Sequence, residues 1–267
     1  MTEQQPRWRS LWRWVLIGLA LAITITWLAL TPTGLLGKAQ AVGYAVCHQI
    51  AERSFHINAR PFPLCARCSG LFLGALLGMI FQWIQGRKGK MPPVGASIFF
   101  AILAILWVMD GVNSFTMLSP KLPSLYQTKT WTRLVTGTGM GLALSAILRP
   151  TFIQTMYKNW KNESPYRTWL HVLFLVALAG GLVGLIWLQS AWILYIFALL
   201  SVFSVIMLLT MVYSMVFVML IKRENTYTHY RELFIPLIAG YIIALLQIGA
   251  ISMVRFYLTG TWSGFSL

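Results

Sequence analysis

The chain alternates between long apolar runs and short polar tracts, and this pattern predicts seven membrane-spanning helices. Each run is close to or above the length of about 20 residues that a helix needs to cross a bilayer. The second run also has glycines at helical spacing, Gly70, Gly74 and Gly78, which permit close approach of another helix. We therefore expect an all-α, polytopic integral membrane protein. The runs cover residues 14–30, 65–84, 94–110, 133–148, 169–188, 191–221 and 233–258.

Composition agrees with a membrane protein and argues against one that binds nucleic acid. Hydrophobic residues make up 58% of the 267 residues and charged residues 10%, and the mean hydropathy of +0.70 lies outside the range of soluble domains. A formal net charge of +15 would suggest nucleic acid in a soluble protein. Here, however, Lys and Arg lie in short tracts between the apolar runs, as in cytoplasmic loops. The expected partner is the lipid bilayer, and no nucleic acid is expected.

The basic tracts also predict an orientation in the membrane. They precede the first run and follow the second, fourth and sixth runs, and loops rich in Lys and Arg stay in the cytoplasm. We therefore expect the N-terminus inside and the C-terminus outside, in the cytoplasmic membrane. No convincing signal-peptide cleavage site follows the first run, so it is expected to remain as a span. The polar segment 35–64 then lies outside, beginning with a short interfacial helix over GLLGKAQAVGYAV.

All three cysteines and two of the four histidines fall within one stretch, VCHQIAERSFHINARPFPLCARCSGLFLG. Cys65 and Cys68 stand at a helix start with the spacing of zinc sites, and Cys47 with one histidine would complete a tetrahedral set. We therefore expect zinc bound by Cys47, His48, Cys65 and Cys68. Neighbours such as Cys47 and His48 point in different directions on a regular helix or strand, which makes His56 the geometric alternative.

Two other interpretations of the cysteines stay open. A Cys-x-x-Cys beside Arg67, in an oxidising compartment, is also typical of a thiol–quinone oxidoreductase. Such enzymes generally use two cysteine pairs, whereas three cysteines leave one without a mate. The remaining interpretation is a plain structural disulfide with a spare thiol.

Charged side chains at the outer ends of the predicted spans complete the candidate site. Asp110, the only aspartate, ends the third apolar run, and Arg133 begins the fourth. A charge within a membrane is costly unless it is paired, so Arg133 is the natural partner of Asp110. We expect Asp110, Arg133 and Arg67 to be catalytic, with Asp110 as a base on metal-bound water and an arginine on a phosphate or carboxylate. The structural alternative for Asp110 is an Asp-Gly turn at the end of the helix.

Five short blocks in order resemble a widespread prokaryotic family of small multi-spanning membrane proteins of unknown function. The resemblance covers residues 40–150, implies that the blocks form one site, and favours His48 over His56 as a ligand. It assigns no reaction. The blocks are Cys47-His48-Gln49, Arg53-Ser54-Phe55, Pro63-Leu64-Cys65-Ala66-Arg67-Cys68-Ser69-Gly70, Asp110-Gly111, and Arg133-Leu134 with Thr136-Gly137.

The extent of the resemblance divides the chain into a four-helix part, residues 1–150, and a three-helix extension, residues 151–267. The leading functional hypothesis is a metal-assisted hydrolase or transferase that acts on a lipid headgroup or another anionic ligand at the outer face. The alternative is a non-catalytic subunit of a larger membrane complex, in which a metal or a disulfide staples the outer loop. A thiol–quinone oxidoreductase is the third hypothesis.

Overall fold

The computed structural model describes residues 7–117 and 125–264, with side chains from residue 13 onward, and its regular structure is almost entirely helical. The all-α prediction is confirmed, and the short helix expected before Cys47 is present as α2. The helices are α1 (Arg7–Leu30), α2 (Leu35–Val46), α3 (Ala66–Ile84), α4 (Val94–Thr116), α5 (Thr130–Met156), α6 (Trp169–Trp187), α7 (Ala191–Leu220) and α8 (Phe234–Thr259). The short elements are the 3-10 turns η1 (Ala51–Arg53) and η2 (Tyr230–Leu233) and an antiparallel hairpin, β1 (His56–Ile57) and β2 (Arg60–Pro61).

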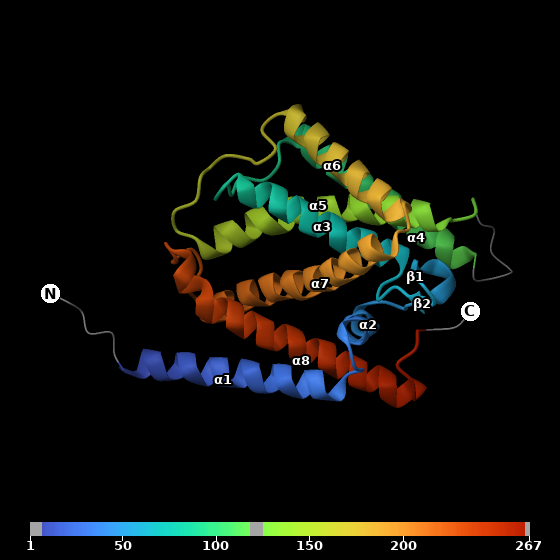
Figure 1. Ribbon diagram of the computed structural model, residues 1–267. Helices are drawn as coiled ribbons and strands as arrows, with labels where there is room; N and C mark the ends of the chain where they lie inside the picture. Colours follow the sequence, from blue (N-terminus) through green and yellow to red (C-terminus); the bar gives the residue numbers. More distant parts are fainter. Residues whose placement is uncertain (1–6, 118–124, 265–267) are drawn as a thin grey trace.

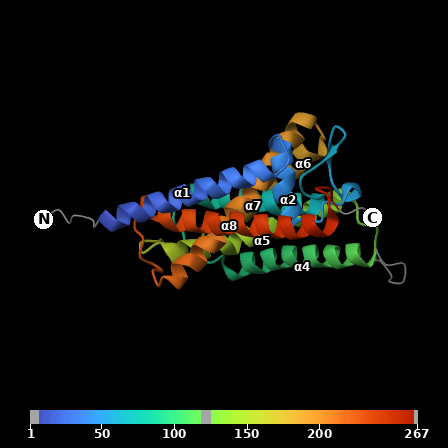
Figure 2. The same cartoon turned by 90° about the horizontal axis from the view of Figure 1, so that it is seen from below.

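The long helices form an elongated bundle. The start of α1 lies at one end, and α2 with the β1–β2 hairpin lies at the other (Figure 1). The turned view shows α1, α4, α5 and α8 following the same axis (Figure 2). Within the described residues, six helical segments are long and apolar enough to cross a membrane: those of α1, α3, α4, α6, α7 and α8. The chain is therefore a multi-pass membrane protein.

Helix α5 is the predicted span that does not meet this criterion. It is long enough, at 27 residues, but it carries Arg133 and Arg149 and many small residues, and most of its side chains are buried inside the bundle. Its polarity is matched by neighbouring helices rather than by lipid. The crossing of α5, and with it the total of seven spans, stays a prediction.

Helices α3 and α5 pack with their backbones in contact, as the glycine spacing predicted. Gly70 and Gly74 of α3 face α5, and Gly137 and Gly141 of α5 face α3. A methyl group added at any of the four would lie 2.1–2.4 Å from a backbone oxygen of the facing helix. Only hydrogen fits there, so the glycines set the distance between the two helices.

The connections after α3, α5 and α7 meet at the end of the bundle where α1 begins. Lys88 pairs with Lys161 and Tyr157 with Tyr227 in short backbone bridges. The guanidinium of Arg87 lies 4.3 Å from the centre of the Tyr157 ring. These are three of the four basic tracts that the positive-inside pattern assigns to one side of the membrane. Their meeting at one end agrees with that assignment.

Helix α4 continues past the predicted end of the third apolar run. It runs to Thr116, six residues beyond Asp110, so the Asp-Gly turn considered for Asp110 is wrong. The Asp110 side chain bonds to other elements and does not cap its own backbone. Asn113 holds the returning chain instead: its Oδ1 accepts from the Leu125 N–H at 2.7 Å and its Nδ2 donates to the Tyr126 carbonyl at 2.7 Å.

Candidate metal centre and arginine cluster

The three cysteines meet at the end of the bundle opposite the basic connections. Cys47 follows α2, Cys65 is the N-cap of α3, and Cys68 lies in the first turn of α3. Their three sulfur atoms lie within 4.8 Å of one another, and in the described part of the chain this is the one group of three or more metal-ligand side chains. All three thiols are free; Cys47 is buried, and Cys65 and Cys68 are half-buried.

The backbone around Cys47 directs two N–H groups at its sulfur. The Cys65 N–H donates to Cys47 Sγ at 3.2 Å and the Gln49 N–H at 3.4 Å. Gln49 has a φ of 53°, and its buried side chain donates to the carbonyls of Gln40 and Pro63 at 2.9 and 2.7 Å. These bonds fix the loop across the start of α3. Hydrogen bonds from N–H groups favour the thiolate, the form that binds metals.

The sulfurs also shift one another's ionisation. Hydrogen bonds from the thiols of Cys47 and Cys68 hold the pKa of Cys65 well below its usual range, with a smaller contribution from Arg67, although burial opposes them. The pKa of Cys47 rises to about 12, chiefly because its thiol donates to the Cys65 sulfur, and burial adds to the rise.

The structure leaves both candidate histidines outside the sulfur cluster. Cys47 has an extended backbone, with φ −140° and ψ 148°, so the side chains of Cys47 and His48 leave on opposite sides. His48 is exposed, and its carbonyl accepts from Arg255 at 3.2 Å. His56 is exposed in β1 and lines a separate cavity. Three of the four predicted ligands come together, and the fourth does not.

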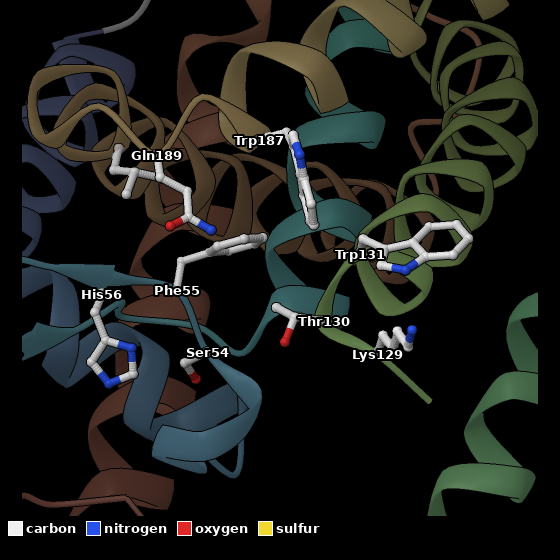
Figure 3. A pocket seen from close by; sticks show the side chains of 9 residues that line it. Ser54, Phe55, His56, Lys129, Thr130, Trp131, Trp187 and Gln189 are labelled. Atoms are coloured by element: carbon white, nitrogen blue, oxygen red, sulfur yellow. The ribbon is translucent and has the colours of Figure 1, made fainter. Parts of the chain in front are cut away.

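The cavity at His56 has a volume of about 370 Å³ and lies where η1, β1, the start of α5 and the α6–α7 connection meet (Figure 3). Aromatic rings from three of these segments face it, together with a few polar groups. Its lining residues are Ser54, Phe55, His56, Lys129, Thr130, Trp131, Trp187, Gln189 and Leu194.

Asp110 pairs with Arg67, and the predicted pairing with Arg133 is wrong. Asp110 is fully buried. Its Oδ2 accepts from Arg67 Nη2 and, at 3.1 Å, from Arg67 Nε. Oδ1 accepts from the Tyr126 hydroxyl at 2.8 Å, and the Thr136 hydroxyl lies 3.4 Å from Oδ2.

The close contact of α3 and α5 explains this pairing. A methyl group at Gly137 would lie 2.2 Å from the Arg67 carbonyl, so the start of α3 lies directly on α5 beside α4. A methyl group at Gly111 would lie 3.8 Å from Arg67 Nη1, so the guanidinium passes close to the α4 backbone. Arg67 therefore reaches Asp110 from a neighbouring helix.

Arg133 is buried in a different set of contacts. Its Nη2 donates to the hydroxyls of Ser114 and Thr128, both at 2.9 Å. Arg53, which was not among the predicted catalytic residues, donates to the same Ser114 oxygen at 3.4 Å. The feature of the sequence that could have identified Arg53 as a site residue is its position in the motif block Arg53-Ser54-Phe55. Arg53, Arg67 and Arg133 form the arginine cluster of the site.

Arg255 of α8 was also not among the predicted site residues. Its Nη1 donates to the carbonyls of Tyr44 and Cys47 at 2.6 and 2.7 Å, and its guanidinium lies 3.9 Å from the centre of the Tyr44 ring. The signal in the sequence was a lone arginine near the end of the last apolar run. The last helix thus holds the loop that carries Cys47.

The motif region matches a known family. Residues 47–147 match the family described as "Predicted membrane protein (DUF2085)", which confirms the expected resemblance to multi-spanning membrane proteins of unknown function. An uncharacterized protein of Methanocaldococcus jannaschii is 29% identical over 123 residues, 45% of this chain and 72% of the relative. One of Methanothermobacter thermautotrophicus is 27% identical over 105 residues, 39% of this chain and 85% of the relative. No solved structure matches the chain.

Proposed function

We propose that the region shared with this family is a metal centre at the extracytoplasmic face of the cytoplasmic membrane, and that it acts on an anionic ligand by metal-assisted hydrolysis or group transfer. The observation that carries the proposal is the meeting of three cysteine sulfurs within 4.8 Å. They come from two separate segments, which are tied together by the N–H groups that point at Cys47.

The donor set supports zinc. Thiolates suit zinc, which is bound tetrahedrally by Cys, His and carboxylate ligands. Catalytic zinc sites use three protein ligands and leave the fourth position for water or substrate, whereas structural sites are closed by four. Cys47, Cys65 and Cys68 supply three ligands, so the fourth position would be taken by water or by the anionic ligand. A zinc ion there would polarise an oxygen of the ligand or activate a water molecule.

Within this proposal, Asp110 positions Arg67 and does not act as a base. Its carboxylate has no exposed surface, and both oxygens accept hydrogen bonds from side chains of other segments, so a water molecule cannot reach it without breaking these contacts. Arg67 lies between the two cysteines of α3 in sequence and keeps 18% of its side chain exposed. It can therefore contact an anionic ligand while it is bound to Asp110.

The first test is elemental analysis of the purified protein. We expect about one zinc per chain in the wild type, and loss of that zinc in Cys65→Ser, because the two ligands that remain are fewer than the three or four protein ligands of zinc sites. His48→Ala is the matched control and should keep the metal. Absence of metal from the wild type, with Cys65 and Cys68 oxidised to a disulfide, would exclude the metal centre and favour thiol–quinone chemistry.

The second test separates an enzyme from a subunit. The zinc-loaded protein in nanodiscs is incubated with mixed phospholipids, and the lipid products are followed by mass spectrometry. We expect turnover that a chelator abolishes and that Arg67→Gln lowers, while Arg167→Gln, at an exposed site in the connection after α5, leaves it unchanged. A metal-loaded protein without turnover that co-migrates with other membrane proteins in mild detergent would instead be a non-catalytic subunit.

A further inference from the structure

We propose that Arg53 and Arg133 bind the phosphate group of an anionic ligand. Two guanidinium groups from different segments converge on one neutral oxygen, Ser114 Oγ, at 3.4 Å and 2.9 Å. Arg53 lies in η1 and Arg133 in the first turn of α5, so the pair spans two elements. A tetrahedral oxyanion presents several acceptor oxygens, which matches donors that arrive from two directions.

The hydrogen bonds of Arg133 leave a gap that an anion would fill. Arg133 is 6% exposed, yet its hydrogen-bond partners among the described residues are two neutral hydroxyls. Its Nε is buried and has no hydrogen-bond partner in the described part of the chain. A buried guanidinium is normally paired with a carboxylate, and the one aspartate of the chain is taken by Arg67.

Charge balance by itself does not require an anion. Asp110 and the exposed Glu52 interact with the cluster and offset most of its positive charge. The missing acceptor for Arg133 Nε is a second, independent observation. A buried N–H group that loses its hydrogen bonds to water and gains no other acceptor lowers the stability of the fold. A phosphate oxygen would accept from Arg133 Nε and replace the weak contact between Arg53 and Ser114.

A cavity lined by sequence neighbours of both arginines, though not by the arginines themselves, indicates what the phosphate carries. The two segments that hold the arginines also line the cavity: Ser54 follows Arg53, and the residues from Lys129 to Trp131 precede Arg133. Figure 3 shows Phe55, Trp131 and Trp187 around the cavity, with Lys129 at its side. Aromatic walls with a cation suit an apolar group attached to a phosphate, as in a lipid phosphate. The inference deepens the proposed function by naming its ligand class, but phosphate binding by arginines requires no metal.

The test is calorimetric titration of the purified full-length protein in detergent with inorganic phosphate and with dihexanoyl phosphatidic acid; dihexanoyl phosphatidylcholine is the zwitterionic control. We expect Arg53→Gln and Arg133→Gln each to weaken binding at least about tenfold, the effect of losing a charged hydrogen bond. Arg133→Lys should restore little, because it lacks the planar fork. Arg167→Gln should bind as the wild type, and thermal unfolding of every variant checks its fold.

The two possible sources of phosphate give different results. If the ligand is a lipid, phosphatidic acid binds more tightly than inorganic phosphate, and Trp131→Ala weakens the lipid alone. If it is free phosphate, the two probes bind equally and Trp131→Ala has no effect. Failure of the folded wild type to bind either probe, or wild-type affinity in folded Arg53→Gln, overturns the inference. Cys65→Ser separates it from the metal proposal: phosphate binding that survives metal loss supports the site independently.

Discussion

At the scale of single residues, Asp110 joins three parts of the structure. It lies on α4 and accepts from Arg67 of α3, from Thr136 of α5 and from Tyr126 of the segment between α4 and α5. A carboxylate with no exposed surface is tolerated because each of its oxygens is hydrogen-bonded and one faces a guanidinium. Asp110 therefore links α4 to α3, to α5 and to the segment between α4 and α5.

Asp110→Asn is expected to lower the free energy of unfolding by about 3 kcal/mol, since breaking a buried ion pair strands the partner's charge. Thermal unfolding in detergent measures the change. Glu163→Gln is the comparison, because the pair of Lys88 and Glu163 is long, at 3.8 Å, and its carboxylate is 53% exposed. That variant should cost far less. Equal losses in the two variants would contradict the structural role given to Asp110.

The pKa of the Tyr126 phenol should depend on the Asp110 carboxylate. Partial burial raises its pKa to about 12, and the hydrogen bond to Asp110 adds to the rise because it holds the proton on the phenol. The phenol therefore stays neutral between its ordinary pKa of about 10 and about 12, and ionises only above that range. The difference in phenolate absorbance between wild type and Tyr126→Phe gives this titration. Asp110→Asn should move it to lower pH, and an unmoved titration would exclude the hydrogen bond.

The sequence was informative about which residues gather and much less about which residues pair. Cys47, Cys65 and Cys68 could be grouped because they flank one loop whose two ends are a short helix and a span. The Asp110 partner could not be chosen, since it depends on how far apart α3 and α5 lie and on their rotation. In the sequence, Arg133 begins the span that follows Asp110 and therefore looks like the nearer partner. In the structure, the close glycine contact between α3 and α5 brings Arg67 next to α4.

At the scale of elements, the contact between α3 and α5 determines the geometry of the site. The first turn of α3 carries Arg67 and Cys68, and the first turn of α5 carries Arg133. Their separation is fixed by glycines on both helices. The glycine spacing in α3 predicted a close neighbour but could not say that the neighbour is α5.

Gly74→Ala is expected to destabilise the protein by about 1–3 kcal/mol, the usual cost of overpacking, because the added methyl group would meet the Thr138 backbone. The matched control is Gly181→Ala in α6, where nothing lies within 4 Å of the added methyl group. That variant should be neutral or slightly stabilising, since Ala favours helix more than Gly. Thermal unfolding in detergent compares the two. A tolerated Gly74→Ala would mean that α3 and α5 lie further apart.

Helix ends were the least predictable part of the fold. The third apolar run stops at Asp110 in a hydropathy profile, but α4 continues to Thr116. Two of the extra residues, Asn113 and Ser114, are polar yet buried, because both bond to other segments. A polar residue such as Asp110 ends an apolar run in a hydropathy profile, but it need not end the helix.

At the scale of the whole molecule, the basic connections and the sulfur cluster lie at opposite ends of the bundle (Figure 1). Under the positive-inside rule, the basic end is cytoplasmic. An alkaline phosphatase fusion after Lys90 should therefore be inactive, because that enzyme folds only in an oxidising compartment. A fusion after Gly260 should be active. The opposite pattern of activities would invert the orientation and put the cysteines in the cytoplasm.

Helix α5 has a consequence for synthesis. Helix α5 has arginines near both ends and glycines along one side. It is therefore not apolar enough for the translocon to insert it into lipid as a single helix. In the finished protein α3 and α4 cover these groups. If α5 crosses the membrane as predicted, the nascent chain would have to keep α3 and α4 beside the translocon until α5 emerges, and the three helices would enter the bilayer together.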